Sequence, residues 1–155
     1  ETMNAAHGIG LAAPQIGLDI RLFIVDVTPL ADDEDYEDIA DELKDFKKVF
    51  INARILEESG NEWKFNEGCL SIPDVREDVS RKETILIEYF DENFVKHTET
   101  FSDIRARVIQ HEYDHIEGVL FTDKLSPLKK KIIKGKLTKI TSGDIHVGYK
   151  MRFPK

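Results

Sequence analysis

The chain of 155 residues is the size of one domain, and 41% of its residues are hydrophobic, which excludes a disordered or fibrous protein. No apolar stretch approaches the ~18 residues of a membrane span, so no membrane partner is expected. The segment Asp32–Asp45 has nine acidic residues and one lysine, and so carries the whole formal net charge of −8. Acidic and basic residues are equal in number in the rest of the chain, so no uniformly basic surface for a specific nucleic-acid partner is expected.

The first third of the chain is predicted to contain a helix end, a glycine-rich segment and one strand. Residues 1–6 are expected to be the last turns of a helix that Gly8 caps. The segment Gly8–Gln15 is too poor in charge for an ordinary surface loop, and Ile20–Val27 has the composition of a buried strand. The acidic segment Asp32–Asp45 predicts a solvated loop whose deletion leaves activity largely intact.

Two hairpins are predicted in the middle of the chain. Residues 59–61 (Ser-Gly-Asn) are a turn signal, so Val49–Glu58 and Glu62–Asn66 are expected to pair. Thr84–Phe90 and Val95–Phe101 flank a polar turn and form the second predicted hairpin.

Two helices and a strand complete the prediction. Asp103 is a good N-cap for a helix that runs to about Glu117. A basic helix is expected over Pro127–Thr138, and a last strand over Ile145–Phe153. The order of elements predicts an α+β fold in a single domain, residues 1–155, with antiparallel strands around one central helix.

The strongest chemical signal is the pair His111 and His115 on this central helix. Residues four apart project from one helix face, so the two imidazoles can share a metal, and Glu112 is placed to act as a general base. Ile104 and Val108 precede His111 at the same helical phase, so the histidines follow an apolar stripe. Buried histidines need partners, and a metal satisfies both together.

A third ligand is expected upstream of this helix. The extended metzincin pattern needs a histidine where the chain has Phe121, and the region Lys129–Lys139 lacks the downstream glutamate of thermolysin-like enzymes. Cys69 is the candidate, although a lone cysteine is more often a small buried hydrophobe. A Cys/His/His set leaves a fourth position open for water, as in catalytic sites.

Three segments together resemble the signature motifs of the peptide deformylase family: Gly8–Gln15 (GIGLAAPQ), Glu67–Ser71 (EGCLS) and His111–His115 (HEYDH). The resemblance implies that family's fold around a metal-binding helix. It also implies an iron-dependent hydrolase that removes the formyl group from the N-terminal formylmethionine of new bacterial or organellar polypeptides and releases formate. The alternatives are a zincin-type metalloprotease and a non-catalytic metal-binding module, and turnover of a formyl-Met peptide distinguishes them.

The resemblance also implies residue roles. The metal, Fe²⁺ with Zn²⁺, Ni²⁺ or Co²⁺ as substitutes, would be held by Cys69, His111 and His115. Glu112 would be the catalytic acid and base, and the Gln15 side chain and the Leu70 N–H would stabilise the oxyanion. The substrate would be bound by Ile9, Gly10, Phe65, Glu67, Gly68, Arg76, Ile104 and Val108.

Partners and location follow from the same resemblance. The partners would be N-formylmethionyl peptides that emerge from the ribosome. The lysine-rich segment 129–139 could touch the ribosome weakly, although a solvated helix face is the commoner role of such a segment. The expected location is the bacterial cytoplasm, with an organelle as the alternative. Most of the family's segment before the first motif is expected to be missing, and residues 32–45 are expected to be an acidic insertion.

Overall fold

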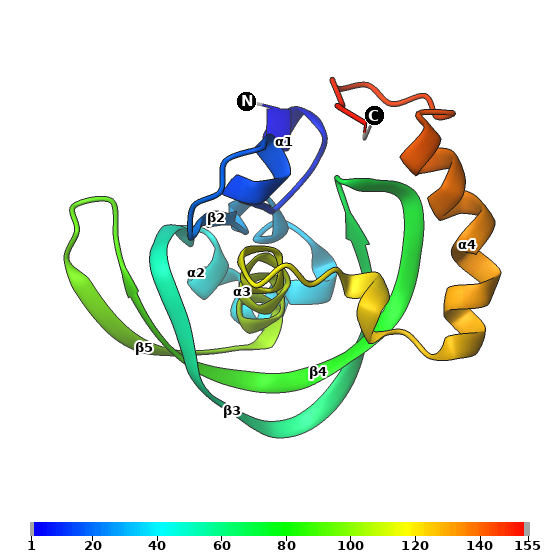
Figure 1. The fold of residues 1–155 in the computed structure, drawn as a ribbon. Coiled ribbons are helices and arrows are strands. Elements are labelled where there is room, and N and C mark those ends of the chain that lie inside the picture. The colour runs from blue at the N-terminus through cyan, green and yellow to red at the C-terminus, as the bar shows by residue number, and fades with distance from the viewer. Residues whose placement is uncertain (1, 154–155) are drawn as a thin grey trace.

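The backbone forms a curved antiparallel sheet with one helix inside its curve (Figure 1). The computed structural model describes residues 2–153. The strands pair in chain order: β1 (Gly10–Ala12), β2 (Leu22–Asp26), β3 (Lys47–Cys69), β4 (Ile72–Phe90) and β5 (Lys96–Ser102). The helices are α1 (Thr2–Ala5), α2 (Ala40–Leu43), α3 (Asp103–Ile116) and α4 (Pro127–Ser142), with 3-10 helices η1 (Ala13–Ile16), η2 (Thr28–Leu30), η3 (Glu34–Ile39) and η4 (Phe121–Lys124). Within the described residues, no helix is long and apolar enough to cross a membrane.

The long β3–β4 hairpin curves around α3 and differs from the predicted pairing. Residues 59–61 are not a hairpin turn, because β3 runs through them and pairs with β4 from Ile51 to Cys69. The register shifts between Ser59 and Glu62, and Gly60 adopts a φ of +79° there. A bulge and a turn use the same residue types, and the bulge adds the bend that wraps the strand around the helix. The true turn is Leu70–Ser71, between the paired residues Cys69 and Ile72.

The core fills the space between this sheet and α3. Phe50 stacks on Phe23 at 4.7 Å and lies 4.4 Å from the Tyr89 ring, centroid to centroid. Ile104 and Ile109 of α3 are buried against this cluster. The predicted α+β fold with antiparallel strands around a central helix is confirmed, and so is the hairpin that ends with β5.

The boundaries of α3 follow its sequence signals. The Asp103 carboxylate accepts a hydrogen bond from the Arg105 N–H, as an N-cap does. Gly118 adopts a φ of +73°, and the Val119 N–H donates to the Asp114 carbonyl at 2.8 Å. These contacts hold both ends of the helix that carries the histidine motif. At α1, by contrast, the left-handed residue is His7 with a φ of 54°, not the predicted Gly8, and Glu1 lies outside the described residues.

The acidic segment is folded, so the prediction of a solvated loop is wrong. It forms η3 and α2, and the carboxylates lie on the outside. Leu43 is fully buried, and Tyr36 and Ile39 pack against the core. The prediction rested on the many acidic residues and did not use the helical spacing of these three apolar residues. These three residues determine how the segment packs.

The C-terminal residues do not form the predicted strand. After α4, which extends beyond the predicted end to Ser142, residues 144–153 run as irregular backbone. The Tyr149 hydroxyl donates to the Leu70 carbonyl, and the Phe153 ring packs against Gly143. Strand propensity reflects packing on a half-buried sheet surface, and this tail packs instead on a turn and a helix end.

Candidate active site

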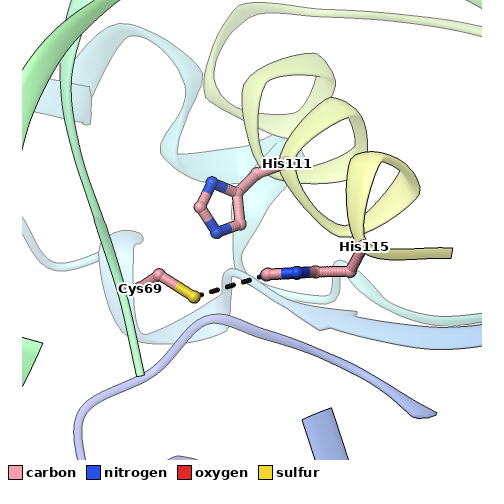
Figure 2. Close-up of side chains that lie close together, drawn as sticks. All are labelled: Cys69, His111 and His115. Atoms are coloured by element: carbon pink, nitrogen blue, oxygen red, sulfur yellow. Dashed lines mark hydrogen bonds between the residues drawn. The ribbon is translucent and has the colours of Figure 1, made fainter. Parts of the chain in front are cut away.

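Three potential metal ligands converge where the β3–β4 turn meets α3 (Figure 2). Cys69 is the last residue of β3, and His111 and His115 lie one turn apart on α3. One ligand atom from each lies within 4.8 Å of the other two, and the Cys69 Sγ is 3.3 Å from the His115 Nε2. The predicted ligands therefore come together from segments more than 40 residues apart in the chain.

Burial favours the neutral forms of Cys69 and His115. It raises the pKa of the Cys69 thiol to about 11, although backbone N–H groups of Ser71 and Ile72 hydrogen-bond the sulfur and oppose the shift. Burial, with the nearby His111 and Arg81, lowers the pKa of His115 to about 4. A neutral imidazole is ready to bind a metal, and a divalent cation would favour the thiolate over the thiol. One sulfur and two nitrogens at this spacing fit a tetrahedral ion with one position free.

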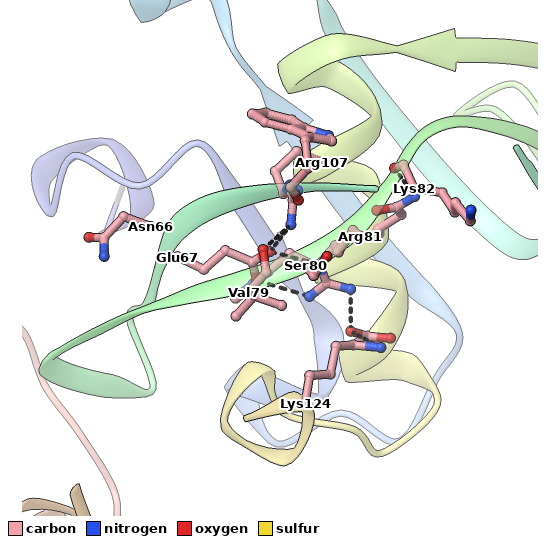
Figure 3. A network of polar contacts seen from close by, with 12 residues as sticks. Asn66, Glu67, Val79, Ser80, Arg81, Lys82, Arg107 and Lys124 are labelled. Carbon is pink, nitrogen blue, oxygen red and sulfur yellow. Dashed lines mark hydrogen bonds and ion pairs between the residues drawn. The ribbon is translucent and has the colours of Figure 1, made fainter. Parts of the chain in front are cut away.

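Glu67 binds Arg81 and Arg107 (Figure 3) and orients the first histidine. Its Oε2 lies 3.0 Å from the His111 Nδ1, which leaves the His111 Nε2 for the metal. Arg81 donates to both Glu67 oxygens at 2.7 and 2.9 Å, and Arg107 donates to one at 2.8 Å. Burial alone would raise the pKa of Glu67, but the hydrogen bonds from Arg81, His111 and Arg107 hold it well below its ordinary value.

Glu112 brings a buried carboxyl group to the site. It is 4% exposed, and its Oε2 finds no hydrogen-bond partner among residues 2–153. Burial, together with the charge of Glu67, raises its pKa well above the ordinary value. A Cβ on Gly10 would lie 2.4 Å from the Glu112 Oε1, so only glycine leaves room for this side chain. A buried carboxyl oxygen without a partner is costly and points to a bound species that the site is built to take.

Gln15 faces the metal ligands from η1. The Ala12 N–H donates to its Oε1 at 2.8 Å, which fixes the direction of the amide. The Nε2 donates to the Ser71 Oγ at 3.1 Å and to the Cys69 Sγ at 3.5 Å. The side-chain N–H groups of Gln15 and the Leu70 turn therefore lie beside the same thiol.

A cavity of about 700 Å³ opens from this cluster, and every predicted substrate-binding residue lines it. These residues are Ile9, Gly10, Phe65, Glu67, Gly68, Arg76, Ile104 and Val108. The polar groups of two of these residues already have partners within the protein. The Glu67 oxygens bind Arg81, Arg107 and His111. The Arg76 guanidinium donates to the side chain and the carbonyl of Asn66. The six others supply a largely apolar lining.

Several residues of the site were not predicted from the sequence. Arg81 and Arg107 are buried beside Glu67, and Asp114 of the histidine motif pairs with Arg81 at 2.7 Å. An arginine within the apolar run of α3 was a usable signal, because a buried guanidinium requires an anion. Tyr36 from the acidic segment and residues 146–149 from the tail also line the cavity, and no local pattern marked them.

The chain is similar to peptide deformylases over nearly its whole length. Residues 1–131 match the family model described as polypeptide deformylase. The chain is 63% identical to the peptide deformylase of Christiangramia forsetii and 62% identical to that of Flavobacterium johnsoniae, and each alignment covers 99% of this chain and 79% of the relative. The solved structure of a peptide deformylase from Legionella pneumophila is 36% identical with a TM-score of 0.74, over 92% of this chain and 76% of that one.

Proposed function

Because this chain belongs to the polypeptide deformylase family, whose members remove the N-terminal formyl group from nascent peptides, we propose how its own residues carry out that hydrolysis. One observation carries the proposal. The ligand atoms of Cys69, His111 and His115 lie within 4.8 Å of one another, beside the unpaired buried carboxyl oxygen of Glu112.

Glu112 is proposed as the group that moves the proton. It accepts a proton from the attacking water and returns it to the leaving amine, which yields formate and a free N-terminus. A raised pKa suits both steps, because a carboxyl group that titrates nearer to neutral pH is an effective base and an effective acid in turn. Gly10 leaves the space that the carboxyl group needs.

The Gln15 amide and the Leu70 N–H are proposed to stabilise the negative charge that develops on the formyl oxygen. The Gln15 amide is held in place by the Ala12 N–H, so it does not have to reorganise during the reaction. One preorganised donor of this kind is worth about 3–4 kcal/mol of transition-state stabilisation.

The metal is a divalent cation, and we propose Fe²⁺, with Zn²⁺, Ni²⁺ or Co²⁺ as substitutes. Cys69, His111 and His115 would hold it, and the unpaired Glu112 oxygen supports the fit. When bound, it supplies a Lewis acid that makes water nucleophilic near neutral pH and polarises the formyl group. Glu67 keeps the His111 ring oriented for binding.

The methionine side chain is proposed to lie against the apolar face of α3. Ile104 and Val108 line the cavity on this face, and Phe65 lines it from β3. Gly10, the first residue of β1, and Ile9, which precedes it, are proposed to pair with the peptide backbone. Gly68 allows the close approach of this backbone. The Glu67 side chain contributes the edge of this pocket while its oxygens stay bound to their partners.

Contact with the ribosome and action in the bacterial cytoplasm remain part of the proposal. Helix α4 presents lysines 129, 130, 131, 134, 136 and 139. Lys129 is already paired with Glu77 at 2.8 Å, which weakens its part in such a contact. The relatives are bacterial, where formylated nascent chains leave the ribosome in the cytoplasm.

The experiment compares Glu112→Gln with Cys69→Ala. We expect the Gln variant to bind metal with the parent stoichiometry and to lose 10²–10⁴-fold or more in kcat on formyl-Met-Ala-Ser, because it cannot accept the proton. The Ala variant should lose metal and activity together. Unformylated Met-Ala-Ser serves as the control for peptide cleavage. A metal-loaded Gln variant that turns over near the parent rate would refute the role of Glu112.

A further inference from the structure

The C-terminal tail reaches the catalytic cavity although it lies outside the matched family segment, residues 1–131. Gly143 ends α4 with a φ of 76°, and the chain then turns back over the tip of the β3–β4 hairpin (Figure 1). A Cβ on Gly143 would lie 3.1 Å from the Phe153 ring, so the two ends of the tail meet. Between them, His146–Tyr149 line the same cavity as Cys69 and His111.

One hydrogen bond joins this tail to the turn that carries the site. The Tyr149 hydroxyl donates to the Leu70 carbonyl oxygen at 2.7 Å, across 79 residues of sequence. Tyr149 is partly buried, and burial raises the pKa of its hydroxyl, so the group remains a neutral donor at physiological pH. The partner is a backbone atom of the two-residue turn after Cys69.

The geometry of the peptide group carries this contact to the metal ligand. No cis peptide bond occurs in the described part of the chain, so the carbonyl of Leu70 and the N–H of Ser71 point in opposite directions within one rigid plane. Tyr149 holds the carbonyl end. The N–H end is the Ser71 group whose interaction with the Cys69 sulfur opposes the rise in the pKa of the thiol. Gln15 holds the Ser71 hydroxyl at 3.1 Å. The turn is therefore fixed on one side by Tyr149 and on the other by Gln15.

We propose that Tyr149 is a positioning residue of the deformylase site, which orients the Leu70–Ser71 peptide and through it the Cys69 sulfur and the Leu70 N–H. Tyr149 touches neither of these groups directly: it binds the carbonyl of the Leu70–Ser71 peptide, and the Leu70 N–H lies in the adjoining Cys69–Leu70 peptide. The inference rests on the roles proposed above for Cys69 and Leu70. A purely structural contact would anchor the tail without affecting the position of the Cys69 sulfur.

The test is Tyr149→Phe, which keeps the ring and removes only the hydroxyl. Lys150→Ala is the matched control, because Lys150 is exposed in the same tail and does not line the cavity. Loss of one neutral hydrogen bond predicts a kcat on formyl-Met-Ala-Ser about five- to tenfold lower, with KM within about twofold of the parent. The second measurement is independent of turnover: release of Co²⁺ to a chelator should be several-fold faster, and the sulfur-to-cobalt absorption band should shift.

The control should match the parent in all three measurements. The inference is overturned if Tyr149→Phe keeps kcat, Co²⁺ release and the absorption band at parent values, or if Lys150→Ala shows the same losses. Failure of the proposed catalytic roles gives a different pattern, namely full turnover by metal-loaded Glu112→Gln. The Co²⁺ measurements report on Tyr149 in either case.

Discussion

Replacement of Glu67 by Gln tests the buried network behind the metal site. Glu67 is 4% exposed, and both of its oxygens accept hydrogen bonds from cationic or imidazole partners. Gln keeps the shape but removes the charge, and its amide can accept on one side only. In this variant Arg81 would still form its ion pair with Asp114 at 2.7 Å. Arg107 would retain only its hydrogen bonds to the carbonyls of Val79 and Trp63. One buried guanidinium would lose its counter-ion.

The expected cost is large because the charges are desolvated. The side chains of Arg107 and Glu67 are 1% and 3% exposed, so water cannot replace the lost partner. Breaking a buried ion pair on one side costs about 3–5 kcal/mol of the free energy of unfolding. The His111 ring also loses the acceptor that orients it, and loss of such a contact weakens metal binding about 10–100-fold.

The pH dependence gives this prediction a second, independent readout. The pKa of Glu67 is lowered in the folded protein, so its contribution is complete above the unfolded value of 4.5 and declines as the pH falls below it. The destabilisation by Glu67→Gln should therefore be largest near pH 6 and smaller near pH 3.5.

The assay is denaturant unfolding of metal-free samples at both pH values, with metal titration at pH 7. Glu88→Gln is the control, since Glu88 pairs with the exposed Lys96 and its loss should cost about 1 kcal/mol or less. A Glu67→Gln cost no larger than the control cost, and equal at both pH values, would refute the reasoning.

Three further outcomes are expected. Gly10→Ala places a Cβ 2.4 Å from the Glu112 Oε1 and should lower kcat at least 100-fold with metal retained, whereas Gly135→Ala, which meets no atom within 4 Å, should not change kcat. Leu43→Ala should reduce the free energy of unfolding by about 2–5 kcal/mol in thermal or denaturant melts, and Glu42→Ala, on the exposed side of α2, by less than about 0.5. The iron-loaded enzyme should lose activity during storage in air and the nickel-loaded enzyme should keep it, because thiolate and ferrous ion are both oxidisable; equal loss by both forms would contradict the iron assignment.

The sequence predicted the parts of the fold and site that depend on short-range pattern. The capping residue, the histidine spacing and the terminal glycine of helix α3 all lie within 16 residues. The sequence therefore predicted both the position of this helix and the face that bears the histidines. Cys69 was found by elimination and by resemblance, and the structure places it beside both histidines. Prediction was poorer where one pattern has two structural outcomes. Ser59-Gly60-Asn61 is compatible with a turn or a bulge, and the pairing of β3 with β4 from Ile51 to Cys69 favours the bulge.

The residues that the sequence did not reveal share a physical property: each acts through a long-range contact. The sequence signal at Arg107 does not name its anion, Glu67, and nothing near Tyr149 in the sequence names its acceptor, Leu70; these partners are 40 and 79 residues away. The motifs include Glu67, which orients His111, but they omit the arginines that bind Glu67 and the tyrosine that binds the turn after Cys69. In this protein buried arginines bind Glu67 behind His111, and the C-terminal tail binds the turn after Cys69. The precision of the site therefore depends on residues outside all three motifs, and substitutions there should alter metal binding even when every motif residue is unchanged.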